Sequence, residues 1–387
     1  MFKFPLKEMR SLQGKHTTIC NYIENVLDSV LSDEASTIKQ SYLVLEVIKE
    51  PCGFLFIPRY PTNLVLNTDT YYRIYDIISA AVFPEYTCVR PTSMQLVEVD
   101  GEQLATARGF YFPGYKGKKQ RLVGTITKIV ADYDLNKEIP LMRGLTVGRN
   151  ATIWIISGNT GSGKSYALRY LEEIISRLTN QNGDKSAQVI MIDPKKSDGA
   201  RYAKKHTEIK LLIPEDSDRP EDFLTRVNAE LAAVVKEMQL RQSKLYEVSN
   251  KISTDANEIN VPPIFVVLEE MASLTLGLAP TSRQVKDLYR ELELIALLGR
   301  ESLINLIITS QIARNDIVPI PIRSQMNVRI LLGRIDKATV QYLFPSMIDG
   351  LSIPIGGLGT GIIEINDGKH YGIEPLAMPT ITKGEES

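Results

Sequence analysis

A glycine-rich segment of eight residues constrains this 387-residue chain more than any other feature. It fits the pattern G-x-x-x-x-G-K-[ST]. Its residues are Gly158, Asn159, Thr160, Gly161, Ser162, Gly163, Lys164 and Ser165. The apolar run 151–157 predicts a buried strand before it, and the spacing of Leu168, Leu171 and Ile175 predicts a helix after it. Strand, glycine-rich turn and helix together indicate a phosphate-binding P-loop, whereas a chance glycine-rich turn would lack these flanks.

Each residue type in this segment suits a nucleoside triphosphate. Glycines let the backbone wrap closely around a polyphosphate, and the N–H groups at the start of a helix favour negative charge. Lys164 is expected to reach the β- and γ-phosphates, and the Ser165 hydroxyl is expected to ligate Mg²⁺. The sequence therefore predicts a site for ATP and Mg²⁺ at residues 158–165.

A second strand with acidic residues at its end fits the Walker B pattern. The apolar run 264–268 is followed directly by Glu269 and Glu270. In this pattern the first acid holds Mg²⁺ through water, and the second polarises the attacking water. We therefore predict Glu269 as a metal-site residue and Glu270 as the catalytic base, although most P-loop ATPases carry Asp at the first position. A solvated acidic turn is the alternative.

Polar residues also end two further predicted strands. The run 188–192 is followed by Asp193, Pro194, Lys195 and Lys196, and the run 303–309 is followed by Ser310 and Gln311. Such residues fall on the sheet edge where parallel α/β folds bind ligands. Gln311 is the candidate for a hydrogen bond to the γ-phosphate or the attacking water, and a capping side chain is the alternative.

The order of apolar runs and helices divides the chain. From residue 151 onward, buried strands alternate with long helices such as 221–248 and 285–299, which predicts an α/β fold with a mainly parallel sheet. We expect a RecA-like P-loop NTPase domain over 134–380, entered through a linker-like stretch at 134–150, and a polar tail at 381–387. The segment 271–286 is expected to be a loop.

Residues 1–133 predict a small α+β accessory domain. Its expected elements are helices at 16–34 and 68–81 and strands at 42–48, 54–58, 89–99, 108–112 and 122–129. The densest basic cluster of the chain lies at 116–121. A solvated loop explains this cluster, and a contact with a phosphate backbone is the functional alternative.

The composition limits which partners and which cellular compartment we expect. The net charge of −1 gives no global basic signal, so any contact with nucleic acid must be local. Three cysteines, Cys20, Cys52 and Cys88, have no metal-type spacing and indicate free thiols in a reducing compartment. No apolar run approaches the roughly 20 residues that span a bilayer, and no signal-peptide pattern opens the chain. We therefore expect a cytoplasmic protein with only indirect membrane association.

Several of these segments together resemble the motor domain of the FtsK/SpoIIIE family, within the HerA–FtsK group that includes conjugative coupling proteins. The similarity covers about residues 134–370, and the P-loop alone is its least specific part. The matching segments are 158–165, 192–195, 237–241, 267–274, 300–311, 320–321 and 334–336. Leu303 stands where the family has Gly, and the chain has no room for the family's winged helix.

This resemblance implies an ATP-driven motor for double-stranded DNA that works as a hexameric ring. It implies a pore lined by loops such as 275–286, and an arginine supplied to the neighbouring subunit's site. Arg300, Arg323 and Arg329 are candidates, and Arg323 is preferred because it follows the rigid run 319–322.

The cargo and the host process stay open. The size favours plasmid or integrative-element transfer over chromosome segregation. One alternative is an ATPase for protein cargo, as in type VII-like secretion. Another is an ATP-gated adaptor that recruits a relaxase or replication initiator, possible because Glu269 replaces Asp. A relaxase or a membrane protein is then the expected partner.

Overall fold

The computed structural model describes residues 13–31, 42–49, 52–59, 67–99, 107–118, 120–311, 317–333, 337–345, 357–370 and 372–382. The chain forms two compact units. Unit 1 comprises Met1–Lys119, Asp349–Ser352 and Tyr371–Glu374, and unit 2 comprises Gln120–Ile348, Ile353–His370 and Pro375–Ser387. In the described part of the chain, no helix combines the length and the apolar character that crossing a bilayer requires.

Unit 1 is a small α+β fold. Its helices and strands are α1 (Thr18–Leu31), β1 (Tyr42–Val47), β2 (Gly53–Pro58), α2 (Thr68–Val82), β3 (Tyr86–Cys88), β4 (Arg90–Pro91), β5 (Leu96–Glu98) and β6 (Arg108–Lys116). The sheet order is β1-β2-β6-β3, with β5 also paired to β6. Aromatic rings fill its core, where Tyr71 stacks on Phe112 with ring centroids 4.8 Å apart. The strand expected over 89–99 is wrong as one element, because the described residues there form the two short strands β4 and β5.

Unit 2 contains the P-loop. Its first elements are β7 (Val123–Gly124), α3 (Ile126–Val130), β8 (Glu138–Met142), β9 (Leu145–Gly148), β10 (Ile153–Gly158), α4 (Lys164–Ile175), β11 (Gln188–Ile192), α5 (Asp198–Ala203), β12 (Ile209–Leu212) and α6 (Pro220–Val248). The remaining elements are η2 (Ala256–Ile259), β13 (Ile264–Leu268), α7 (Met271–Leu274), α8 (Arg283–Leu298), β14 (Ile304–Ser310), α9 (Ile320–Ser324), β15 (Val328–Leu332), α10 (Lys337–Leu343), β16 (Thr360–Ile365), β17 (Gly372–Ala377) and β18 (Thr380–Ile381). Of β17, only the residues from Pro375 onward belong to unit 2.

The main sheet of unit 2 runs in the order β12-β11-β13-β14-β10-β15-β16-β17. Strands β12 to β15 pair in parallel, and β16 joins β15 antiparallel. Strands β10, β13 and β14 are buried along their whole length, as expected for a parallel sheet covered on both faces. The expected α/β fold with a mainly parallel sheet is thereby confirmed.

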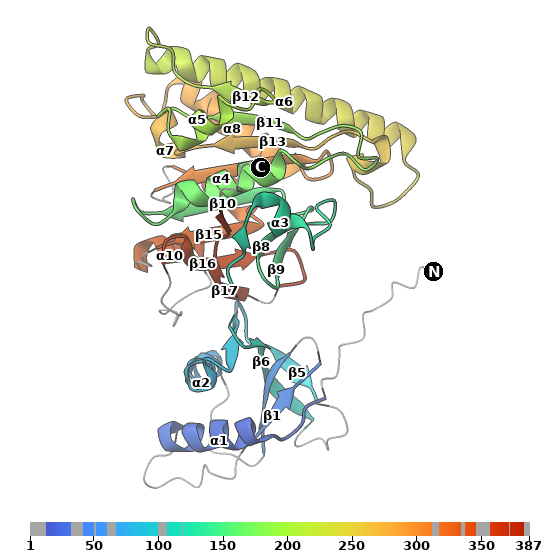
Figure 1. Cartoon of the computed structure of the whole chain (residues 1–387), viewed down its shortest axis with the longest axis vertical. Helices are drawn as coiled ribbons and strands as arrows, with labels where there is room; N and C mark the ends of the chain where they lie inside the picture. Colours follow the sequence, from blue (N-terminus) through green and yellow to red (C-terminus); the bar gives the residue numbers. More distant parts are fainter. Residues whose placement is uncertain are drawn as a thin grey trace. The chain divides into compact units, whose positions relative to one another are not determined.

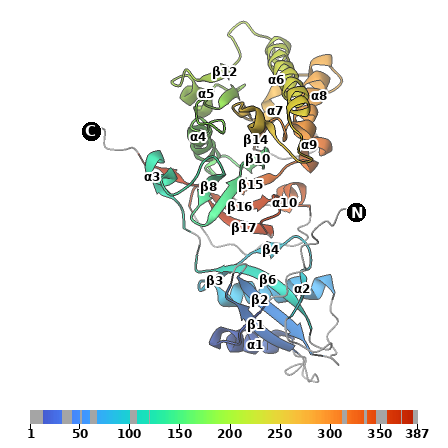
Figure 2. The same cartoon turned by 90° about the vertical axis from the view of Figure 1, so that its right-hand side faces the viewer.

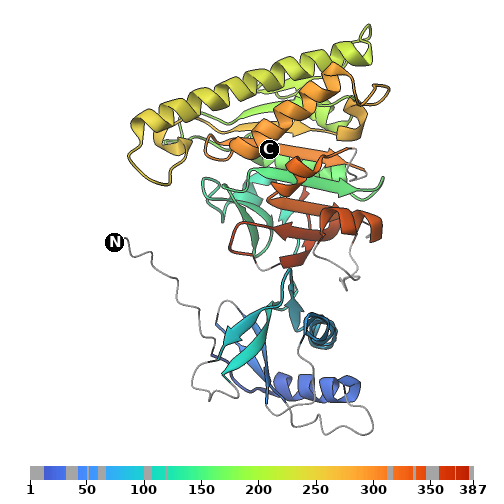
Figure 3. The same ribbon diagram turned by 180° about the vertical axis from the view of Figure 1, so that it is seen from behind.

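Helices cover the two faces of this sheet. Figure 2 shows α4 and α5 on one face and α6, α8 and α9 on the other. The long helix α6 extends along the sheet (Figure 1), and α8 packs beside it (Figure 3). Because the chain returns to the same sheet edge after every parallel strand, the tips of β10, β11, β13 and β14 meet at one edge. The P-loop follows the first of these strands.

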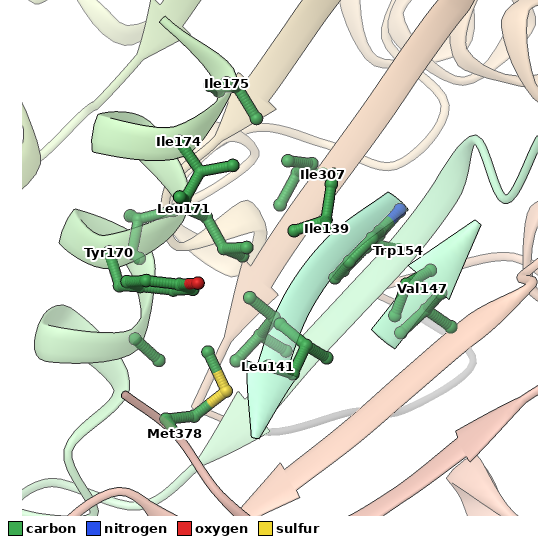
Figure 4. Packing of buried hydrophobic residues seen from close by; sticks show 14 of the residues in the cluster. Ile139, Leu141, Val147, Trp154, Tyr170, Leu171, Ile174, Ile175, Ile307 and Met378 are labelled. Atoms are coloured by element: carbon green, nitrogen blue, oxygen red, sulfur yellow. The ribbon is translucent and has the colours of Figure 1, made fainter. Parts of the chain in front are cut away.

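Three sequence expectations fail in unit 2. The linker expected at 134–150 contains the hairpin β8–β9, which turns at Gly144 with φ 75°. The apolar side chains of this hairpin belong to the core that also holds Trp154 and Leu171 (Figure 4). Its proline and glycines mark a turn and a register shift, so they did not indicate a domain boundary.

The strand expected at 122–129 ends after Gly124. The side chain of Thr125 accepts a hydrogen bond from the Lys128 amide and so caps α3. The loop expected at 271–286 contains the short helix α7 and the first turn of α8.

Candidate functional site

The P-loop joins the end of β10 to the start of α4. Gly161 and Gly163 have φ values of 80° and 95°, in the left-handed region that glycine adopts without strain. A Cβ atom on Gly163 would lie 2.4 Å from the amide nitrogen of Gly359. The Gly359 amide in turn donates to the carbonyl of Ser162 at 2.8 Å. The turn before β16 therefore braces the P-loop, a contact that the sequence reading did not anticipate.

Glu270 lies directly against the P-loop lysine. Its carboxylate Oε2 is 3.0 Å from Lys164 Nζ, and the two side chains are only 7% and 14% exposed. Its backbone has φ 54°, and its amide donates to Thr309 Oγ1 at 3.0 Å. A non-glycine residue in this conformation persists only where its surroundings hold it, and such residues concentrate at functional sites. The structure thus brings together Lys164 and Glu270, which the sequence named for binding and catalysis.

The strand tip of β14 holds the other oxygen of Glu270. The main-chain amide of Gln311 donates to Glu270 Oε1 at 3.1 Å, and Ser310 Oγ lies 3.5 Å from the same atom. The main-chain N–H of Gln311 therefore reaches the site, whereas its side chain is exposed. Lys195, at the tip of β11, adds a second cation with its Nζ 3.7 Å from Oε2.

Glu269 is buried on the opposite side of the same strand tip. Burial raises the pKa of its carboxyl to about 7; a Ser197 hydrogen bond lowers it, while the charge of Asp193 raises it further. In the part of the chain that the structure describes, Glu269 Oε2 has no hydrogen-bond partner. Asp193 accepts hydrogen bonds from the Lys195 amide and from the Ser197 amide and hydroxyl. This side of the site is rich in carboxylates.

Glu172, on α4, is a further member of this cluster that the sequence reading missed. Burial, followed by repulsion from Glu269 and Asp193, raises the pKa of its carboxyl to about 9. Neither of its carboxylate oxygens has a hydrogen-bond partner among the described residues. A Cβ on Gly199 would lie 3.0 Å from Glu172 Oε1 and 2.4 Å from Glu269 Oε2, so both carboxylates flank this glycine. The available signal was an acidic residue one turn after Leu168, on the apolar face of the helix.

The three candidate arginines have different surroundings. The guanidinium of Arg323 lies 4.3 Å from the centre of the Tyr342 ring and donates to the Tyr342 carbonyl at 3.2 Å. Arg329 is paired with Glu364 at 2.7 Å, with side chains 12% and 4% exposed. Arg300 is exposed and lies before β14, at the sheet edge opposite the P-loop. The expected motif 334–336 lies outside the described residues.

Searches of known proteins identify similar folds. No protein-family model matches the sequence, and no curated protein matches it. The chain is similar in structure to the pCW3 conjugation coupling protein TcpA, solved as a monomer form with ATPγS, with 15% identity, a TM-score of 0.53, and coverage of 94% of this chain and 95% of that chain. It also matches the cytoplasmic domain of the Thermomonospora curvata type VII secretion ATPase EccC, with 16% identity and a TM-score of 0.49. That match covers 68% of this chain and 32% of EccC.

The fold and the P-loop together define a P-loop NTPase. The likeness to TcpA confirms the predicted fold class, and it confirms the resemblance to FtsK/SpoIIIE-type proteins at the level of the fold. At this identity the likeness carries no residue roles. The roles assigned to individual site residues therefore stay predictions.

Proposed function

We propose that this chain is an ATP-hydrolysing motor that translocates double-stranded DNA, in conjugative or mobile-element transfer or in DNA segregation. The main observation in favour of ATP hydrolysis is the contact between Lys164 and Glu270 at 3.0 Å. It joins the side chain that neutralises phosphates to the carboxylate that would activate water. The fold shared with the conjugation coupling protein TcpA supports DNA as the cargo.

The geometry suggests how ATP binding prepares the site. In the structure, the ammonium of Lys164 donates a hydrogen bond to the carboxylate of Glu270. A triphosphate in the P-loop would compete for the same ammonium, because phosphate oxygens are strong acceptors of charge-assisted hydrogen bonds. Glu270 would then be free to orient the attacking water, while the Gln311 amide and the Thr309 hydroxyl keep its backbone and carboxylate in place.

The residues present fit a magnesium ion. Mg²⁺ prefers hard oxygen ligands and is usually held by one or two carboxylates together with substrate phosphates. The Ser165 hydroxyl and Glu269, whose Oε2 has no partner among the described residues, supply such oxygens. When bound, Mg²⁺ would neutralise charge that develops on the β- and γ-phosphates. Among the described residues, no group of three or more His, Cys, Asp or Glu side chains forms a metal site by itself.

DNA-stimulated ATP hydrolysis tests this function. We expect turnover to rise with long duplex DNA and the stimulation to fall steeply with added salt, because contacts with phosphates release counterions. Lys164→Ala is the control for contaminating ATPases. Equal turnover with and without duplex, together with no DNA retention in low-salt filter binding, would overturn DNA as the cargo and favour a protein cargo. A Glu270→Gln variant with wild-type turnover would favour the ATP-gated adaptor.

We further propose that the protein works in the cytoplasm as a hexameric ring with Arg323 acting in the neighbouring site. Two inactive variants, Arg323→Ala and Glu270→Gln, are mixed before assembly. If Arg323 acts in trans, some interfaces in mixed rings carry neither defect, so ATP hydrolysis returns. Arg329→Ala serves as the comparison, because its ion pair with Glu364 predicts a loss of stability instead. No recovery in rings shown by mass photometry to be mixed would exclude Arg323.

A further inference from the structure

Arg121, the last residue of the basic cluster 116–121, contacts the turn that braces the P-loop. Its Nη2 donates to the carbonyl of Leu358 at 2.6 Å, and its Nη1 donates to Thr380 Oγ1 at 3.1 Å. These three residues belong to unit 2. One cation of the cluster is therefore engaged within the unit that holds the P-loop.

The contact with Leu358 leads to the P-loop through two peptide groups. The carbonyl of Leu358 and the amide of Gly359 belong to one peptide group, and this amide donates to the carbonyl of Ser162 at 2.8 Å. The carbonyl of Ser162 and the amide of Gly163 belong to a second peptide group. Two hydrogen bonds and two peptide groups thus join the guanidinium of Arg121 to the Gly163 amide.

The geometry of the second peptide group fixes the direction of the Gly163 N–H. A trans peptide group is planar, so its carbonyl and its N–H point in opposite directions. The Ser162 carbonyl points toward Gly359, so the Gly163 N–H points away from the turn. In this motif the backbone N–H groups cradle phosphates. Because the turn occupies one side of the peptide group, a polyphosphate held by this N–H lies on the other side.

Main-chain hydrogen bonds anchor the rest of the turn. The Met378 amide donates to the Gly359 carbonyl, and the Gly333 amide donates to the Thr360 carbonyl, each at 2.8 Å. Of these three anchors, the one from Arg121 is made by a side chain and carries a charge. A single substitution can therefore remove it and leave the other two in place.

The charge of Arg121 matters for the strength of the chain of hydrogen bonds. A hydrogen bond from an ionised donor is stronger than one between neutral groups, and hydrogen bonds that follow one another polarise each other. The guanidinium therefore strengthens the bond from the Gly359 amide to the Ser162 carbonyl. A polarised Ser162 carbonyl in turn makes the Gly163 N–H a better donor to an anion.

We propose that Arg121 is a positioning residue for the phosphate site, which orients and polarises the Gly163 N–H through the two peptide groups 358–359 and 162–163. It does so without contacting the nucleotide. The proposal rests on the proposed function, since it requires that the P-loop bind a nucleoside triphosphate. It adds a residue far outside the P-loop motif that controls the affinity of the loop for phosphate.

Calorimetric binding of two ligands tests the proposal. ATP reports the whole nucleotide, and inorganic tripolyphosphate reports the phosphate site alone. We expect Arg121→Gln to weaken both ligands by a similar factor, about 2- to 12-fold, which is the contribution of one hydrogen bond. Arg121→Lys keeps the charge and should restore most of the affinity. Arg149→Gln is the matched control, because Arg149 is also half-buried and donates to a main-chain carbonyl, that of Leu135 at 3.3 Å.

The amide proton of Gly359 gives a readout that a merely structural role would not move. In the nuclear magnetic resonance spectrum of isotope-labelled protein, we expect this proton to shift upfield in Arg121→Gln, because its hydrogen bond to Ser162 weakens. Thr380→Val removes the acceptor of Arg121 Nη1 and leaves the contact with Leu358. It should shift the same resonance in the same direction by a smaller amount.

The possible results separate the proposal from the function on which it rests. Wild-type affinity for both ligands in Arg121→Gln, or an unmoved Gly359 resonance, would overturn the positioning role. Loss of affinity for ATP alone would overturn it as well, because that result indicates a contact with the nucleoside. An equal loss in Arg149→Gln would show a general effect of removing an arginine.

If Arg121→Gln does not fold, Thr380→Val decides the question, and wild-type affinity with an unmoved Gly359 resonance in that variant would overturn the proposal. Wild-type protein that binds neither ATP nor tripolyphosphate would overturn the proposed function and the positioning role with it.

Discussion

The carboxylates on the two sides of the β13 tip have different surroundings, although they belong to consecutive residues, Glu269 and Glu270. The carboxylate of Glu270 is paired with Lys164 and held by the Gln311 amide. The carboxylate of Glu269 lies toward Glu172 and Asp193, and one of its oxygens has no partner among the described residues. One side is therefore charge-compensated in the structure itself, and the other has an excess of acidic groups.

This difference indicates separate roles for the two acids. A carboxylate paired with a lysine can act as a base once its partner is drawn to phosphate. A buried carboxylate among other carboxylates is destabilised when ionised, so it gains most from a bound cation or a proton.

Removing Lys164, the cation paired with Glu270, should have the largest effect on ATP hydrolysis. Lys164→Ala is expected to lower ATP hydrolysis by roughly 10²-fold or more, because the transition-state charge on the phosphates loses a positioned partner. Steady-state phosphate release measures this. Lys195→Ala is the matched control, since its ammonium is 3.7 Å from Glu270 and 47% exposed. If both variants lose activity equally, Lys164 has no special role among the cations near Glu270, and the prediction fails.

Replacing the buried acid of the other side should change how stability depends on pH. Burial and then the charge of Glu269 raise the pKa of Glu172 from 4.5 to about 9, so the folded state keeps a proton that the unfolded chain releases. Stability should therefore fall as pH rises from about 4.5 to about 9, by up to ~1.4 kcal/mol per pH unit. Because the raised pKa of Glu269, about 7, also lowers stability between pH 4.5 and 7, Glu172→Gln should reduce this slope there and remove it between about pH 7 and 9. The variant should be more stable than wild type at pH 8.

Urea unfolding at several pH values, with EDTA to exclude divalent cations, measures the slope. Glu173→Gln, the next residue on α4, is the control and should keep most of the wild-type slope, because the charge of Glu173 raises the pKa of Glu172 less than burial, Glu269 and Asp193 do. A Glu172→Gln variant with an unchanged slope would show that this carboxyl is ionised in the folded state, and the comparison between the two sides would then fail.

Crowding the carboxylates should have the smallest effect. In Gly199→Ala the new methyl group would lie 2.4 Å from Glu269 Oε2 and 3.0 Å from Glu172 Oε1. We expect a loss of about 1–2 kcal/mol in the free energy of unfolding. Gly357→Ala is the control, because nothing lies within 4 Å of the added Cβ. Equal stability of the Gly199 variant and wild type would mean that these carboxylates are free to move away.

Local sequence patterns are sufficient to predict part of this site. The P-loop and the acidic pair each follow a strand directly, so neighbouring residues alone indicate them. The parallel sheet then places Lys164 and Glu270 together, because parallel strands end at one edge. The alternating pattern likewise predicted the α/β fold.

The remainder depends on contacts between distant residues. Nothing near Gly359 indicates that its amide bonds to Ser162, and nothing near Gln311 indicates that its amide, not its side chain, reaches Glu270. Glu172 is buried beside Gly199 of α5, a contact that its neighbours in the sequence do not indicate. The sequence of the β8–β9 hairpin predicts a linker, because its proline and glycines resemble a break unless the core beneath them is known.

The most direct test of the account compares Glu270→Gln with wild type at saturating ATP and duplex DNA. The variant should bind ATP as tightly as wild type or more tightly, since Lys164 loses its competing carboxylate, and should hydrolyse it roughly 10²- to 10⁴-fold more slowly. Hydrolysis at the wild-type rate would contradict the assignment of Glu270 as the base.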